Sequence, residues 1–151
     1  LDEHEQAGVQ RAKLLPGVAE FFALLDRLRI PHAVQTRNSR AVAVGMLERC
    51  GLRCNRLLAR EDAPAKPDPT GIWSICRDWQ LPPSRVAMVG DFHFDIDAGR
   101  AAGTWTVLYL RGRPPGEMAW AERADLLLDC FTRPEPLLEW LAVSPADPRR
   151  D

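Results

Sequence analysis

The chain has 151 residues, of which 46% are hydrophobic and 27% are charged, values close to the averages of globular domains. Its 20 basic and 21 acidic residues give a net charge of −1, which argues against a nucleic-acid partner and a membrane-surface partner. No apolar run reaches the ~18 residues of a transmembrane helix, and the acidic start of the sequence is unlike a secretory signal peptide. The sequence therefore predicts a soluble, cytoplasmic protein, and its length favours one domain.

The first half of the chain alternates between helical and strand-like segments. Residues 1–13 are polar and compatible with a helix, but they precede the alternating pattern. Apolar residues recur with helical spacing after Pro16-Gly17, which predicts a helix (Val18, Phe21, Phe22, Leu25 and Leu28). Three further elements are expected in order: a buried strand over 33–36, a helix between Ser39 and Gly51, and a weak strand over 56–59.

The second half continues the alternation. Asp68-Pro69 predicts a helix N-cap followed by proline at the first helical position. The most distinct strand spans 86–89 and ends at Gly90-Asp91. The other expected elements are a helix over 95–102 closed by Gly103, strands over 104–110 and 125–128, a helix over 135–142, and a flexible tail over 144–151. This order predicts an α/β fold with a parallel sheet covered on both faces.

Four cysteines form no C-x-x-C pair and lie in mostly apolar segments (Cys50, Cys54, Cys76 and Cys130). Free cysteine is one of the most frequently buried residue types. The spacing therefore favours buried, reduced thiols over metal ligands or disulfides.

Candidate functional residues follow three of the expected strands. Thr36-Arg37-Asn38 come after the first strand, Lys66 lies in the loop after the second, and Asp91 and Asp95 come after the third. Ligands of open parallel sheets bind beyond the carboxyl ends of the strands. A hydroxyl, backbone amides and an ammonium suit phosphate oxygens, whereas carboxylates can hold Mg²⁺. The set is coherent for metal-assisted phosphoryl transfer.

Each residue taken singly also has a structural interpretation. Thr36 could be an ordinary strand-end residue, and Lys66 a solvated loop lysine. Asp91 could be a turn residue after a glycine, and Asp95 could cap the helix that follows it. The weight of the functional interpretation comes from the order and spacing of the residues together.

Three segments resemble the second, third and fourth motifs of the haloacid dehalogenase-like (HAD) hydrolase superfamily. They are Thr36-Arg37-Asn38, Lys66-Pro67, and the Gly90-Asp91 pair with Asp95 four residues later. Pro16-Gly17-Val18 is similar to the segment that re-enters the core after a helical cap. The resemblance extends from about Leu14 to about Leu110 and is closest to the phosphoglycolate-phosphatase-like branch.

The resemblance implies a Rossmann-like three-layer core and a Mg²⁺-dependent phosphatase that acts on a small phosphorylated metabolite through an aspartyl-phosphate. It implies that Thr36, Arg37, Asn38 and Lys66 bind the phosphoryl group. It further implies that Asp91 binds Mg²⁺, and that Lys66, Asp91 and Asp95 belong to the catalytic set.

The chain departs from the family at its start, since no D-x-D precedes Thr36. In the family this motif ends the central first strand, and its first aspartate is the nucleophile. The resemblance thus implies residues 1–13 as a cap remnant and 14–143 as a core whose first strand and most of whose cap are absent. An upstream segment or a second chain would then complete the sheet, and the missing strand would separate the strands that carry Val34 and Val89. A direct ladder between these two strands would contradict that interpretation.

Three function classes are considered for this pattern of residues. The first is a HAD-like phosphatase present as an N-terminally incomplete chain. The second is a catalytically inactive HAD-like module that binds phosphate or metal or has a regulatory role. The third, a phosphoacceptor receiver domain, fails because receivers run Asp, Thr, Lys and the aspartates come last here.

Overall fold

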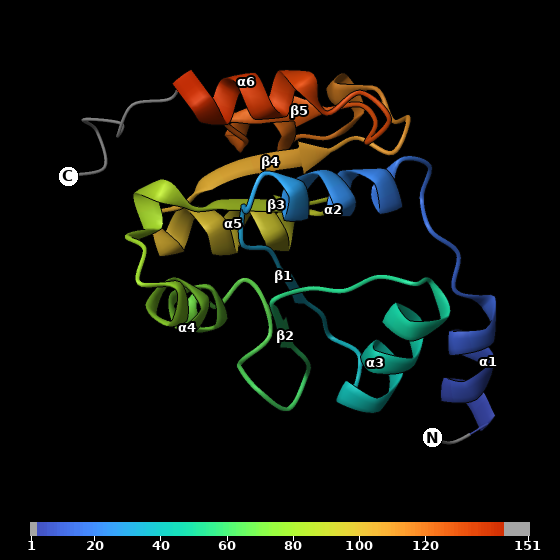
Figure 1. Cartoon of the computed structure of the whole chain (residues 1–151). Helices are drawn as coiled ribbons and strands as arrows, with labels where there is room; N and C mark the ends of the chain where they lie inside the picture. Colours follow the sequence, from blue (N-terminus) through green and yellow to red (C-terminus); the bar gives the residue numbers. More distant parts are fainter. Residues whose placement is uncertain (1–2, 144–151) are drawn as a thin grey trace. The chain divides into compact units, whose positions relative to one another are not determined.

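The computed structural model describes residues 3–143, which form two compact units divided between Ala65 and Lys66 (Figure 1). They are called the N-terminal unit and the C-terminal unit, and each is described by itself. The predicted flexible tail over 144–151 lies outside the described residues. Within 3–143, no helix is long and apolar enough to cross a membrane.

The N-terminal unit contains a two-stranded parallel sheet and three helices. Its elements are α1 (Glu3–Arg11), α2 (Val18–Arg27), β1 (Ala33–Gln35), α3 (Arg40–Arg49) and β2 (Arg56–Leu58). The ladder runs from the pair Ala33–Arg56 to the pair Gln35–Leu58. Helices α1 and α3 approach closely at Gly45, where an added Cβ would lie 3.2 Å from a methyl group of Val9. Within the polar segment before Pro16, residues Glu3–Arg11 form a helix, as the composition of the segment indicates.

The C-terminal unit is built around a three-stranded parallel sheet in the order β3-β4-β5. Its elements are α4 (Thr70–Trp79), β3 (Ala87–Gly90), α5 (His93–Ala102), β4 (Trp105–Tyr109), β5 (Leu126–Leu128) and α6 (Glu135–Val143). One apolar cluster joins α4 to α5 (Ile72, Cys76, Ala98 and Ala102), and another joins α5 to β4 and the loop beyond it (Ile96, Leu108, Leu110, Met118 and Ala121).

Side chains of β4 alternate between the two faces of this sheet. On one face, Thr106 and Leu108 are completely buried, and a Cβ added to Gly99 of α5 would lie 2.7 Å from Thr106 Cγ2. On the other face, the ring centroids of Trp105 and Trp140 of α6 lie 5.0 Å apart. Helices cover both faces of the sheet, in the layered arrangement visible in Figure 1. The α/β class predicted from the sequence is confirmed.

The strands of the two units form separate sheets, β1-β2 and β3-β4-β5. No hydrogen-bonded ladder joins β1 to β3 among residues 3–143. What lies between these strands in the whole protein stays a prediction, as do the domain boundaries.

Helix starts differ from the sequence-based expectation by one or two residues. Helix α4 begins at Thr70 with Pro69 at its N-cap, one position later than predicted, yet Asp68 Oδ1 still accepts the Thr70 N–H at 2.8 Å. Helix α5 begins at His93 rather than at Asp95, because the Asp95 carboxylate reaches back to the first turn. Both aspartates still accept helix-terminal N–H groups.

The free thiols differ in burial. Cys76 is buried between α4 and α5, whereas Cys50, Cys54 and Cys130 are only partly buried. The prediction of reduced thiols agrees with the structure, and the prediction of burial is correct for Cys76 alone. In the described chain, no cluster of three or more potential metal ligands contains any of them.

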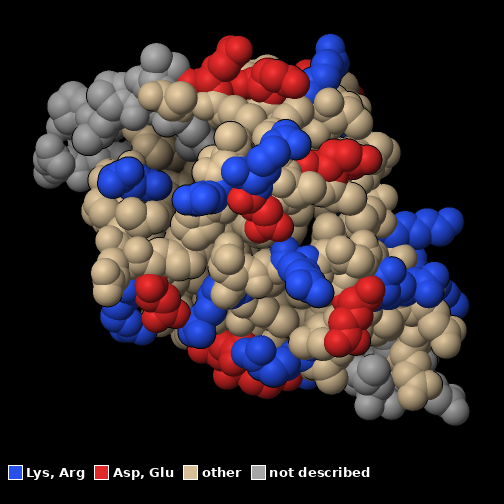
Figure 2. Space-filling model, viewed as in Figure 1, with Lys and Arg blue, Asp and Glu red and all other residues tan. Residues whose placement is uncertain are grey.

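Basic and acidic side chains are interspersed on the face of the molecule in Figure 2. On this face, the basic and acidic side chains are thus not separated into one basic and one acidic area. The absence of a nucleic-acid or membrane partner stays a prediction.

Candidate active site

The N-terminal unit places Thr36-Arg37-Asn38 in the short loop between β1 and α3. The Thr36 N–H donates to Leu58 O at 2.9 Å, so the loop leaves the sheet only after this residue. Thr36 Oγ1 accepts the Asn38 N–H at 3.1 Å, a local turn that fixes where the hydroxyl lies. Arg37 and Asn38 are exposed, and Ser39 caps α3 by accepting the Val42 N–H. This loop presents a hydroxyl and the start of a helix, which suit an anion.

In the C-terminal unit, Asp95 lies directly over the end of β3. Its Oδ2 accepts the N–H groups of Asp91 and Phe92, each at 3.1 Å. A Cβ added to Gly90 would overlap the Asp95 side chain, so glycine is required for this close approach. The predicted capping role of Asp95 is confirmed, with the carboxylate acting from the third position of α5.

Lys66 pairs with the second oxygen of the same carboxylate. The distance from Lys66 Nζ to Asp95 Oδ1 is 2.5 Å, and the side chains are 14% and 9% exposed. Lys66 is therefore not the solvated loop lysine of the structural alternative. Asp95 holds an ammonium and two amides at once, which fixes the position of Lys66 relative to the end of β3.

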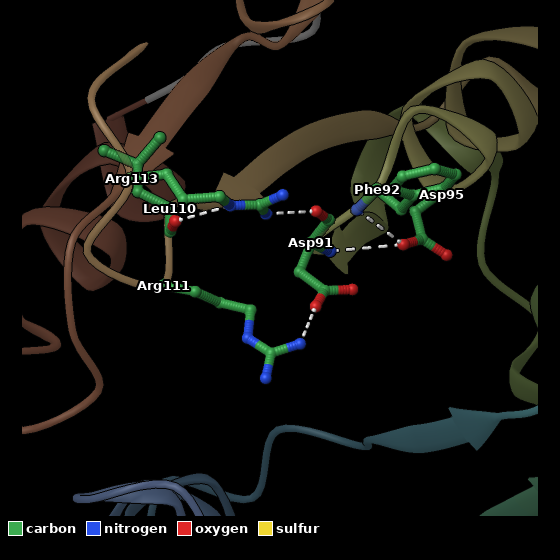
Figure 3. Close-up of polar contacts among 6 residues, drawn as sticks. All are labelled: Asp91, Phe92, Asp95, Leu110, Arg111 and Arg113. Carbon is green, nitrogen blue, oxygen red and sulfur yellow. Dashed lines mark hydrogen bonds and ion pairs between the residues drawn. The ribbon is translucent and has the colours of Figure 1, made fainter. Parts of the chain in front are cut away.

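Asp91 is the more accessible carboxylate, with its side chain 40% exposed. Its Oδ2 pairs with Arg111 Nη1 at 2.7 Å (Figure 3). Its backbone carbonyl accepts from Arg113 Nη2 at 2.6 Å, and Arg113 Nε donates to Leu110 O at 3.1 Å. The loop after β4 thus supplies two guanidinium groups to one aspartate.

Arg111 and Arg113 are functional candidates that the sequence reasoning missed. Their position in the sequence was a usable signal, because both arginines follow β4. Ligands of open parallel sheets bind beyond the carboxyl ends of the strands.

An aromatic group lies beside Asp91. The ring of Phe92 is 5.6 Å from that of Trp120 and 4.5 Å from that of His93, measured between centroids. Phe92 is 42% exposed, and His93 Nδ1 lies 3.6 Å from Asp97 Oδ2. These rings offer an apolar surface next to the exposed carboxylate.

The candidate carboxylate for a divalent cation at the end of β3 is that of Asp91. Asp91 is exposed and chemically suited to Mg²⁺, which usually takes one or two carboxylates and keeps several waters. Both oxygens of Asp95 are already occupied by protein donors. Within residues 3–143, no group of three or more His, Cys, Asp or Glu side chains could hold a metal ion. The donor set fits a hydrated Mg²⁺ at Asp91 and does not form a closed protein site.

Comparisons with known sequences agree on one family. A model of haloacid dehalogenase-like hydrolases matches residues 2–103. A haloacid dehalogenase-like hydrolase domain-containing protein of Arabidopsis thaliana is 34% identical over 107 residues, which are 70% of this chain and 44% of that protein. A phosphoglycolate phosphatase of Chromobacterium violaceum is 34% identical over 91 residues, which are 58% of this chain and 41% of the relative. An N-acetylmuramic acid 6-phosphate phosphatase of Pseudomonas aeruginosa is 29% identical over 135 residues, which are 85% of this chain and 59% of the relative.

Solved structures share the fold. A predicted phosphoglycolate phosphatase of Haemophilus somnus superposes with a TM-score of 0.75 at 24% identity, covering 83% of this chain and 57% of that one. A haloacid dehalogenase-like protein of Agrobacterium tumefaciens superposes with a TM-score of 0.77 at 20% identity, covering 91% and 65%. The chain spans about half the length of the curated relatives it matches, 44% and 41% of the first two. With the fold and the family model in agreement, this chain belongs to the haloacid dehalogenase-like hydrolase family.

Proposed function

We propose that the chain is part of a cytoplasmic, Mg²⁺-dependent phosphomonoester phosphatase that acts on a small phosphorylated metabolite through an aspartyl-phosphate. The observation that carries the proposal is the contact set of Lys66, Asp91 and Asp95 at the end of β3, in a chain of this family. Relatives named phosphoglycolate phosphatase and N-acetylmuramic acid 6-phosphate phosphatase support the substrate class.

Each unit contributes distinct proposed roles. In the N-terminal unit, the Thr36 hydroxyl, the Arg37 amide and Asn38 donate to phosphoryl oxygens. In the C-terminal unit, Lys66 neutralises negative charge on the phosphoryl group, and Asp91 is the carboxylate for Mg²⁺. Asp95 is a positioning residue, because its carboxylate holds Lys66 and the backbone of Asp91. When bound, Mg²⁺ would supply charge neutralisation for the phosphate.

The reaction also needs a nucleophile that the sequence does not provide before Thr36. In an aspartyl-phosphate mechanism, a carboxylate oxygen forms a bond to phosphorus while the ester P–O bond breaks, and the leaving oxygen takes a proton from a general acid and departs as the alcohol. Water then cleaves the acyl-phosphate. No D-x-D precedes Thr36, and Asp95-Ile96-Asp97 lies in α5, where Asp95 is committed to three donors. An upstream segment or a second chain is the proposed source of the nucleophile.

A second candidate function is a binding or regulatory module without catalysis. It is favoured by the missing D-x-D and by the ion pair between the Asp91 carboxylate and Arg111. In this case the phosphate-binding groups would be retained and no turnover would occur.

Hydrolysis of p-nitrophenyl phosphate distinguishes the two candidates. The 151-residue chain is expected to be inactive with and without Mg²⁺, since it lacks the attacking carboxylate. The chain preceded by its natural upstream coding sequence should become active, and Lys66→Met should abolish that activity while Asp97→Asn should not. If the upstream sequence encodes no strand ending in D-x-D and the longer protein stays inactive, the binding module is the correct interpretation.

A further inference from the structure

The two arginines of the loop after β4 engage Asp91 in different ways. Arg111 bonds to the carboxylate, whereas Arg113 bonds to the backbone carbonyl of the same residue (Figure 3). Of these two arginines, Arg111 is the one that occupies an oxygen of the Asp91 carboxylate. The Arg111 side chain is 54% exposed. Because water can solvate the charged guanidinium, Arg111 can leave the Asp91 carboxylate at little energetic cost.

The backbone conformation at this position supports a specific placement. Arg111 has a φ of 55°, in the left-handed region that a residue with a side chain rarely adopts. Arg113 anchors the same loop through Leu110 O and Asp91 O. Such a conformation persists where the surrounding structure determines it, and in this conformation the Arg111 side chain reaches the Asp91 carboxylate.

The neighbouring carboxylate of Asp95 is not available as a substitute for that of Asp91. Asp95 cannot take over, because Oδ1 is paired with Lys66 and Oδ2 accepts two amides. A divalent cation at Asp91 would lie next to a guanidinium that repels it and that holds Oδ2. The two cations therefore compete for one carboxylate.

We propose that Arg111 is a positioning residue that acts through Asp91: a tethered cation that holds this carboxylate until a divalent cation displaces it. The inference rests on the proposed metal role of Asp91. While no metal is bound, the guanidinium holds the Asp91 carboxylate in place and balances its negative charge. The same contact lowers the apparent affinity of Asp91 for the metal. Once displaced, the guanidinium remains within the same loop as a positive charge close to Asp91.

Binding of Mn²⁺ to the 151-residue chain, followed by electron paramagnetic resonance, tests the competition. Arg111→Met should tighten binding by about 1.5- to 5-fold, the range expected from the strength of exposed ion pairs. Arg113→Met is the matched control, since it removes an equal charge from the same loop but leaves the carboxylate pair. Arg123→Met removes a comparable pair with Asp97, whose N–O distance is 2.6 Å. Neither control should tighten binding.

The outcomes separate this inference from the proposed function. If Asp91→Asn leaves Mn²⁺ binding unchanged, the metal role of Asp91 is wrong. If binding depends on Asp91 but Arg111→Met leaves it unchanged or weakens it, the competition is wrong while the metal role survives. Equal tightening by Arg111→Met and Arg113→Met would show a general effect of charge and would also overturn the inference.

If Arg111→Met does not fold, a measurement on the unmodified chain can still test whether a divalent cation displaces Arg111 from Asp91. In a Mg²⁺ titration followed by NMR, the Arg111 side-chain Nε–H signal should shift with the same midpoint as the Asp91 backbone amide. The Arg123 signal should stay in place. An Arg111 signal that does not move while the Asp91 amide saturates would refute displacement.

Discussion

Replacing Asp95 with alanine is expected to destabilise the C-terminal unit by about 3–5 kcal/mol. The carboxylate is 9% exposed, and it pairs at 2.5 Å with Lys66, whose side chain is 14% exposed. Removing one partner of a buried ion pair costs ~3–5 kcal/mol, because the other charge stays in a poorly solvated position. The N–H groups of Asp91 and Phe92 lose their acceptor as well. This loss is a large part of the ~5–15 kcal/mol that stabilises a typical domain.

Urea unfolding followed by tryptophan fluorescence is a suitable assay. All five tryptophans lie beyond Lys66, so their emission reports on the C-terminal unit (Trp73, Trp79, Trp105, Trp120 and Trp140). A lower midpoint with an unchanged slope would show a change of stability alone. Asp95→Asn, which keeps an oxygen for the amides, should lose less stability than Asp95→Ala.

Asp97→Asn is the matched control on the same helix. Asp97 pairs with Arg123 at the surface, with side chains 30% and 48% exposed, and its loss should cost no more than ~1 kcal/mol. In a double-mutant cycle, Lys66→Met should destabilise wild type more than it destabilises Asp95→Asn. A loss below ~1 kcal/mol for Asp95→Ala, or additive effects in the cycle, would refute the energetic importance of the buried pair.

Three further predictions concern other positions. Gly90→Ala should cost ~1–3 kcal/mol in urea unfolding, because the new Cβ overlaps the side chain above it, and an unchanged midpoint would contradict this. The hydrogen bond from the Arg40 guanidinium holds the pKa of Asp62 below its usual value of ~3.9, so Asp62 stabilises the fold above pH ~4. By circular dichroism, the stability difference between wild type and Asp62→Asn should be present at neutral pH and vanish as the pH falls below ~4; a pH-independent difference would be inconsistent with this. Burial raises the pKa of Cys76, whereas the threonine hydroxyl two residues on lowers the pKa of Cys130, so iodoacetamide should modify Cys130 first in peptide maps. The reverse order would contradict the assignment.

The order of helices and strands could be predicted from the sequence because local signals define it. Apolar periodicity predicted α2 and α4, and glycines marked the ends of α3 and α5. The start of α5 was placed two residues late, because Asp95 caps the helix from within its first turn and looks in sequence like an N-cap.

The candidate site could be predicted only in part. The family motifs identified Lys66, Asp91 and Asp95, since their order and spacing are visible in the sequence. The ion pair between Lys66 and Asp95 depends on how two segments 29 positions apart in the chain fold together, and no local pattern encodes it. The contacts of Arg111 and Arg113 were missed for the same reason, although their position after a parallel strand was a usable signal.

The two parallel sheets differ in how easily their backbone can open. Strand β4 has a neighbour on both sides, and Val107 and Leu108 are completely buried. Among residues 3–143, strand β1 has one neighbour and three residue pairs, so its amides are expected to exchange with solvent deuterium at a lower opening free energy. The Thr36 loop thus follows the strand that opens more easily. If the Thr36 loop binds phosphate as proposed, local adjustment there should cost little free energy, and added phosphate should slow exchange in β1 and β2 more than in β4.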